Sequence, residues 1–184
     1  MQYYEKYLTG RINNDPTTRK AWLEGMILLA SHQSFIANIR SNPNLLKFLW
    51  FEINQNCETF NLQIILLVKS TIAIPELLKH YNDEFFILKL LRGFLENYQK
   101  FPSDLTTMCS LEVFHFFCHS KSAINVYLKS KNFFSFLSII WSKGLNPLNT
   151  LTTRIFREII AEANESELKY IVNEDFMDSF RILT

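Results

Sequence analysis

Glycine and proline are scarce in this chain, with only four glycines and five prolines among 184 residues. An all-β fold needs many tight turns, and such turns usually require these residues, so the composition argues against one. The few prolines are informative by position, because proline is tolerated in the first turn of a helix and disrupts its interior. Three of them follow a residue that can cap a helix start, in Asp15-Pro16, Asn42-Pro43 and Asn146-Pro147. The prolines therefore indicate an all-helical chain.

The chain also lacks a strong net charge, a cysteine motif and a long apolar run. The formal net charge is +1, which gives no strong basic footprint for a nucleic acid. Cys57, Cys109 and Cys118 form no paired motif, which predicts reduced, mostly buried thiols in an intracellular protein. The longest apolar run, 64–68, is far shorter than the ~20 residues of a membrane span. The polar N-terminus does not resemble a secretory signal. We therefore expect a cytoplasmic or nuclear protein with no membrane span.

Large apolar side chains are abundant instead. Seventeen residues are phenylalanine, 48% are hydrophobic and 20% are charged. This balance is typical of a globular chain with a sizeable core. No linker, charge block or low-complexity tract divides the sequence, so we expect a single domain over 1–184.

A short pattern recurs about four times along the chain. Its clearest copies are Ile39–Leu49 and Leu128–Leu137, which share an apolar residue, a basic residue, serine, a polar linker and a second apolar run. Weaker copies lie at Leu78–Leu88 and Ile171–Met177. The four anchors, separated by 40, 48 and 43 residues, are Leu45, Phe85, Phe133 and Phe176. Periods in the forties are typical of helical solenoid repeats.

Apolar periodicity and the prolines predict a capping helix over 17–30, followed by triplets of a short, a medium and a long helix. The predicted helices are 32–40, 43–54 and 58–71, then 75–81, 83–98 and 103–119, then 121–129, 132–141 and 147–163, and finally 165–172 and 174–182. These give an N-terminal cap over 1–31, repeats near 32–72, 73–120 and 121–163, and a partial repeat over 164–184. The segment Phe85–Phe94 is apolar on nearly every side, which predicts a central helix covered by neighbours.

The triplet at this period resembles the armadillo repeat. The glycine that armadillo repeats usually carry between their first two helices is replaced here by Ser41-Asn42-Pro43 and Ser130-Lys131-Asn132, which leaves HEAT-like pairing open. The resemblance implies an all-α, right-handed α-solenoid of about three and a half armadillo-like repeats with an N-terminal capping helix.

A narrower resemblance involves Leu111–Phe117 followed by Tyr127–Ser130. These segments look like the long helix and the following repeat start of armadillo-type scaffolds that bind and activate STE-family protein kinases. The resemblance implies a non-catalytic scaffold or adaptor that binds a protein partner. A regulatory subunit of a protein kinase, or of cell-division or cytoskeletal machinery, is the most specific form of this expectation.

His115, Cys118 and His119 have the spacing of metal ligands on one side of a helix. A fourth ligand is missing from the neighbouring sequence, so we expect Cys118 in the core and both histidines at the surface, with no metal and no cofactor. Pairs of acidic residues at 83–84, 165–167 and 174–175 fall at predicted helix starts, where carboxylates favour the positive end of the helix dipole. No motif of a known catalytic site occurs, so we expect no enzymatic activity.

The predicted binding site is a polar ladder on the concave face that the third helices would line. Superposing these helices by apolar spacing brings Gln63, Glu112 and Arg154 to similar positions, and His115 and Arg157 follow one turn later. His119 lies one further turn along. Mixed charge suits an extended peptide or a partner's helix better than a phosphate backbone.

Two alternatives remain open. Nucleic-acid binding would use a basic stripe of Arg11, Lys20, Arg40, Lys47, Lys129 and Lys131, although the low net charge argues against it. Self-association into a homo-oligomer would use apolar residues of the partial last repeat, which are Ile171, Phe176, Met177 and Phe180.

Overall fold

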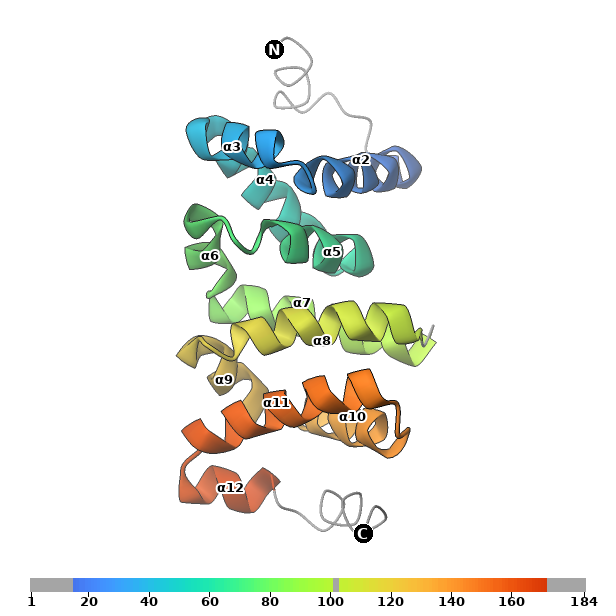
Figure 1. Ribbon diagram of the computed structural model, residues 1–184, viewed down its shortest axis with the longest axis vertical. Helices are drawn as coiled ribbons and strands as arrows, with labels where there is room; N and C mark the ends of the chain where they lie inside the picture. Colours follow the sequence, from blue (N-terminus) through green and yellow to red (C-terminus); the bar gives the residue numbers. More distant parts are fainter. Residues whose placement is uncertain (1–14, 101–102, 172–184) are drawn as a thin grey trace. The chain divides into compact units, whose positions relative to one another are not determined.

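The structure, a computed structural model, describes residues 15–100 and 103–171 (Figure 1). Within these ranges the chain is helical and contains no strand, which confirms the all-α prediction. None of the helices in the same ranges combines the length and the apolar character that crossing a lipid bilayer requires. The chain forms two compact units, Met1–His80 and Tyr81–Thr184, and each is described separately below.

The helices follow the predicted order. The first unit contains α2 (Pro16–Ala30), α3 (Gln33–Ser41), α4 (Pro43–Asn56), α5 (Asn61–Thr71) and most of α6 (Pro75–Tyr81). The second unit contains α7 (Glu84–Lys100), α8 (Asp104–Phe117), α9 (Lys121–Leu128), α10 (Lys131–Ser142), α11 (Asn146–Glu162) and α12 (Glu165–Ile171). Every predicted boundary within the described residues lies within three residues of the observed one. The helix predicted over 174–182 lies outside them.

The predicted order of helix lengths is only partly correct. The first helix of each triplet is the shortest, with 9, 7 and 8 residues in α3, α6 and α9. The third helix is the longest only in the last triplet, where α11 has 17 residues and α10 has 12. In the first triplet, α5 starts late because the turn over 57–60 continues up to Asn61, whose side-chain amide donates to the Cys57 carbonyl at 2.9 Å.

Side-chain caps explain two of the proline-marked helix starts. An Asp15 carboxylate oxygen accepts a hydrogen bond from the Thr18 backbone N–H at 2.9 Å. Asn42 Oδ1 accepts from the N–H groups of Asn44 and Leu45, at 3.1 and 3.2 Å. Each bond satisfies a donor that a helix start leaves without an intrahelical partner. Proline follows the cap in both cases, as predicted.

The predicted cap at Asn146 is wrong. This residue is the first residue of α11, and Leu145 occupies the cap position without a side-chain hydrogen bond. The acidic pair at 83–84 behaves as predicted, because Asp83 Oδ1 accepts from the Phe86 N–H at 3.0 Å. The pair at 174–175 lies outside the described residues.

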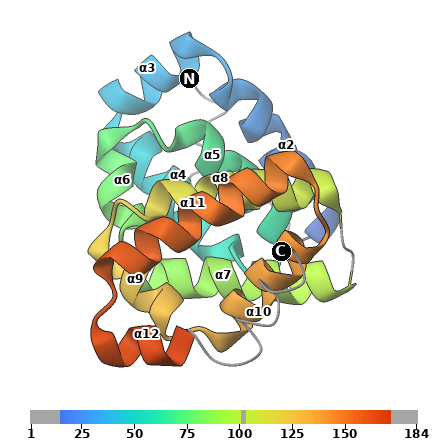
Figure 2. The ribbon, with the colours of Figure 1, turned by 60° about the horizontal axis from the view of Figure 1, so that its bottom comes forward.

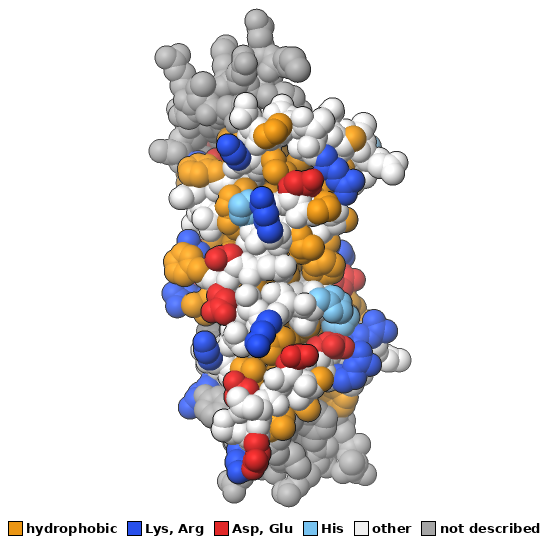
Figure 3. Space-filling view, turned by 90° about the vertical axis from the view of Figure 1, so that its left-hand side faces the viewer, with side chains coloured by type: hydrophobic (Ala, Val, Ile, Leu, Met, Phe, Trp, Pro, Cys, Tyr) orange, Lys and Arg blue, Asp and Glu red, His pale blue; other side chains and the backbone are white. Residues whose placement is uncertain are grey.

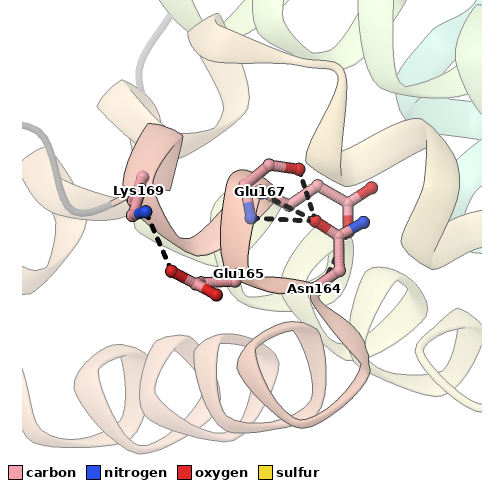
Figure 4. Close-up of polar contacts among 5 residues, drawn as sticks. Asn164, Glu165, Glu167 and Lys169 are labelled. Atoms are coloured by element: carbon pink, nitrogen blue, oxygen red, sulfur yellow. Dashed lines mark hydrogen bonds and ion pairs between the residues drawn. The ribbon is translucent and has the colours of Figure 1, made fainter.

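The start of α12 is a reciprocal capping box (Figure 4). Asn164 Oδ1 accepts from the N–H groups of Ser166 and Glu167, both at 3.0 Å. Glu167 Oε2 accepts from the Asn164 N–H at 2.9 Å, which satisfies a further exposed donor. Lys169 pairs with Glu165 one turn away at 2.8 Å. The acidic residues here therefore serve the helix start, as predicted.

Helices three places apart in the chain pack against each other within each unit. In the first unit α2 packs on α5, and in the second unit α8 packs on α11 and α7 packs on α10. Figure 2 shows α8 and α11 running beside each other. The second unit thus has a pair made by α8 and α11 and another made by α7 and α10.

An aromatic cluster forms the centre of the second unit. The Phe114 ring of α8 is fully buried and meets the rings of Phe94, Phe133 and Tyr127 edge-on, at centroid distances of 5.3, 5.7 and 6.2 Å. These partners come from α7, α10 and α9. The Tyr127 hydroxyl also donates to the Phe114 carbonyl at 3.1 Å. Edge-to-face aromatic pairs contribute about 0.5–1.5 kcal/mol each beyond the burial of their area.

The helix α7 packs on both α9 and α10, but these neighbours do not cover all of its apolar side chains. Phe86, Leu90 and Phe94 are buried, whereas the side chains of Phe85 and Leu88 are 63% and 40% exposed. Apolar residues at consecutive positions cover a wider arc of a helix than its neighbours can reach. One side of α7 therefore presents large apolar side chains to solvent.

Replacing Phe114 by alanine should destabilise the protein by about 3–5 kcal/mol, because the cavity would remove three ring contacts at a fully buried site. The same truncation at Phe85, which is 63% exposed, is the matched control and should cost less than about 1 kcal/mol. Urea denaturation followed by circular dichroism measures both values. Similar losses for the two variants would contradict the position of Phe114 at the centre of the core.

Replacing Asn164 by alanine should weaken the start of α12 by about 1 kcal/mol, because two N–H groups would lose their acceptor. Amide hydrogen exchange at Ser166 and Glu167 should accelerate several-fold. The control is Lys169→Ala, which removes only an exposed ion pair of small energetic value. Equal exchange rates in the two variants would count against the capping box.

Candidate functional site

The side chains of the predicted polar ladder that belong to the second unit gather on α8 and α11. Glu112 and His115 are half-buried on α8, and His119 follows the end of this helix and is exposed. Arg154 and Arg157 are exposed on α11. A view of one side of the molecule shows histidine next to side chains of both charges (Figure 3). We call this surface the α8–α11 face; its members are Glu112, His115, His119, Arg154, Arg157 and Glu158.

The amphipathic pattern of both helices orients this face. On α8, Leu111 and Phe114 are fully buried, and on α11, Ile155 and Ile159 are fully buried. Residues three or four positions apart share one side of a helix, so burying these side chains leaves the polar ones on the other side. Because α8 packs directly on α11, the polar sides of the two helices form one surface.

The electrostatics of the face centre on His115. Its ring centroid lies 6.1 Å from that of His119. Burial lowers the pKa of His115 below its usual value of 6.5, and the nearby positive charges of His119 and Arg154 lower it further. Glu158 opposes this shift. The neutral imidazole is therefore favoured at neutral pH and can both donate and accept a hydrogen bond.

Glu158 belongs to the site although the sequence analysis missed it. Its Oε1 accepts from the Arg157 guanidinium at 2.7 Å, and this hydrogen bond lowers the pKa of the Glu158 carboxyl. Its position four residues after Arg154 is a signal that could have identified it, because residues at this spacing are neighbours on a helix. The face thus presents fixed acceptors as well as donors.

The half-buried Gln63 lies on α5 of the first unit. Glu112 and Arg154 belong to the second unit. Alignment of Gln63 with these two residues along one continuous ladder stays a prediction.

Cys118 lies in the core, while the adjacent histidines reach the surface, as predicted. Its thiol donates to the Phe114 carbonyl at 3.3 Å, and burial, followed by the charge of Glu158, raises its pKa to about 12. Such a thiol stays protonated and is a poor nucleophile or metal ligand. Across residues 15–100 and 103–171, no three His, Cys, Asp or Glu side chains are arranged to hold a metal ion. Cys57 and Cys109 are likewise buried and form no disulfide, in agreement with the prediction.

The basic stripe divides between the two units. Lys20, Arg40 and Lys47 belong to the first unit, Lys129 and Lys131 belong to the second, and Arg11 lies outside the described residues. Lys20 lies 3.9 Å from Glu24 within its own helix, and Arg40 donates to the Ala73 carbonyl at 3.0 Å. Both cations therefore already interact with the protein itself.

The structure does not describe the side chains proposed for self-association. Ile171 is the last residue of α12, and its side chain is not described. Phe176, Met177 and Phe180 lie outside the described residues.

Searches against protein-family models, curated proteins and solved structures found no match to this chain. The geometry of the α8–α11 face is therefore the basis of the functional argument.

The protein should lose stability as the pH falls below 6.5, because the unfolded chain then binds a proton at His115 more readily than the folded one does. This part of the stability is fully present above that pH and is lost toward the lower pKa of the folded state. His115→Gln removes the titrating group, so its stability should fall less between about pH 7.5 and 5.5. Urea denaturation at the two pH values measures the difference.

The control for this experiment is His32→Gln, which removes an exposed histidine of the first unit. If the stability of His115→Gln changes with pH as much as that of the wild type, the lowered pKa of His115 is not the cause of the loss.

Proposed function

We propose that this protein is a non-catalytic interaction scaffold that binds a protein partner through the α8–α11 face. In this proposal the chain is a right-handed α-solenoid of armadillo-like repeats, and the face is part of the concave surface that the third helices of the repeats would line. The scaffold would act as a regulatory subunit of a protein kinase, or of cell-division or cytoskeletal machinery, in the cytoplasm or nucleus.

The packing of helices three places apart supports the repeat architecture. A three-helix repeat stacks each helix on its equivalent in the next repeat. The pairs α2 with α5, α8 with α11 and α7 with α10 follow this rule within their units. The sequence spacing in the forties, on which the resemblance to armadillo repeats rests, agrees with it.

The observation that carries the function is the combination of fixed donors and acceptors on two packed helices. The exposed guanidinium groups of Arg154 and Arg157 lie near His115, and Glu158 adds an acceptor to the same surface. A face with both charge signs is complementary to a peptide or helix of mixed polarity. A phosphate backbone would be repelled by the Glu158 carboxylate, which favours a protein partner over a nucleic acid.

The double variant Arg154→Glu/Arg157→Glu should lose the protein partner, because it reverses two exposed charges of the face without entering the core. Affinity capture from cell extract with quantitative mass spectrometry compares it with the wild type. We expect at least one protein that the wild type captures to fall about tenfold or more in the variant.

The matched control is Arg92→Glu/Lys100→Glu, which makes the same charge change at exposed positions of α7. The control should capture this protein as the wild type does. If both double variants lose it equally, or if neither does, the α8–α11 face is not the binding site.

A further inference from the structure

A second surface of the second unit has a different chemistry. Two open hollows lie beside α7, near the start of α10 and along its length, with volumes of about 620 and 340 Å³. Asn132 lines both hollows, so they adjoin each other, and we call the two together the α7–α10 groove. None of its lining residues belongs to the α8–α11 face. The residues that the argument uses are Glu84, Phe85, Leu88, Lys129, Lys131, Ile139 and Lys143.

The floor of the groove is apolar and open to solvent. Phe85, Leu88 and Ile139 are 63%, 40% and 51% exposed, and all three line the hollows. Single exposed apolar residues are common, whereas several that line one depression mark an interaction site. Helical spacing explains the arrangement on α7, because positions 85, 88 and 95 fall on one side of that helix.

The rim of the groove is mainly basic. Lys129 and Lys131 line one hollow, and Lys143 lines the other. Lys143 Nζ donates to the Tyr98 hydroxyl at 2.9 Å, which fixes this charge at the end of the groove. The acidic residue among those that line the two hollows is Glu84, whose Oε1 accepts from the Asn125 amide at 3.3 Å.

We propose that the α7–α10 groove binds an acidic amphipathic helix of a partner protein. The apolar side of that helix would cover Phe85, Leu88 and Ile139, and its flanking carboxylates would pair with the lysines of the rim. Between positions 84 and 99, α7 spans about 22 Å, at 1.5 Å per residue, which corresponds to about four turns of a bound helix. This is the helix-in-groove mode of recognition, with anchors spaced by three and four residues.

The proposal does not depend on the α8–α11 face, because the two surfaces share no residue and can be tested separately. A nucleic acid would meet the lysines but would leave the apolar floor uncovered, and a second copy of the chain would bury the floor without an added partner. The experiment below therefore also tests whether the groove binds a nucleic acid or a second copy of the chain.

The probe is a random library of 16-residue peptides displayed on phage and selected on the full-length chain. We expect enrichment of peptides that combine Asp or Glu with large apolar residues at helical spacing. Fluorescence anisotropy with the enriched peptides then compares the wild type with Leu88→Glu/Ile139→Glu and with Lys129→Glu/Lys131→Glu. Each double variant should weaken binding about tenfold or more. Circular dichroism establishes that both variants keep the helical fold.

The matched control is Lys100→Glu/Lys121→Glu, which makes the same charge change at exposed positions outside the groove and should bind the peptides like the wild type. The proposal is overturned if no peptides are enriched, if the enriched ones lack acidic residues, or if they bind the floor variant equally well. If a labelled 20-nucleotide single strand or duplex binds more tightly than the enriched peptides do, the groove is a nucleic-acid site. A dimer in sedimentation velocity that Leu88→Glu/Ile139→Glu converts to a monomer would assign it to a second copy.

Discussion

The packing of Phe114 is the interaction on which the second unit depends. Its ring is fully buried and contacts aromatic rings from α7, α9 and α10, and its carbonyl accepts the Tyr127 hydroxyl. Two of the helices that it joins, α9 and α10, have only 8 and 12 residues, and helices of this length are marginal or unstable in isolation. These helices are therefore stabilised by the shared aromatic core. The same packing determines which side of each helix stays in contact with solvent.

Two surfaces of unlike chemistry follow from this core. On α8, burying Leu111 and Phe114 leaves His115 at the edge of the core, where α11 adds Arg154 and Arg157. The helices α7 and α10 carry more apolar side chains than the core can bury. The remaining ones line an open groove with a basic rim. In the proposed scaffold, the first surface would hold one partner by mixed charge and the second would hold the apolar side of another partner's helix.

The helices were predictable because their signals are local. Asp15 and Asn42 precede prolines, and side-chain caps and apolar spacing depend only on nearby residues. The exposure of Phe85 was not predictable, because it depends on how far neighbouring helices reach around α7. Glu158 was missed because superposing helices by apolar spacing finds only positions that repeat from one helix to the next. Its place in the site depends instead on its hydrogen bond with Arg157 and on its interaction with the histidines at the end of α8, which are far away in the sequence. The groove likewise combines residues that sequence alone does not bring together.

Hydrogen–deuterium exchange of the chain, alone and with a protein identified by the affinity capture, tests the central claim most directly. The account predicts slower exchange in the complex at 112–119 and at 154–158, because a partner on the α8–α11 face excludes water from the polar sides of these helices. Unchanged exchange in both segments, with protection confined to α3 and α4 of the first unit, would contradict it.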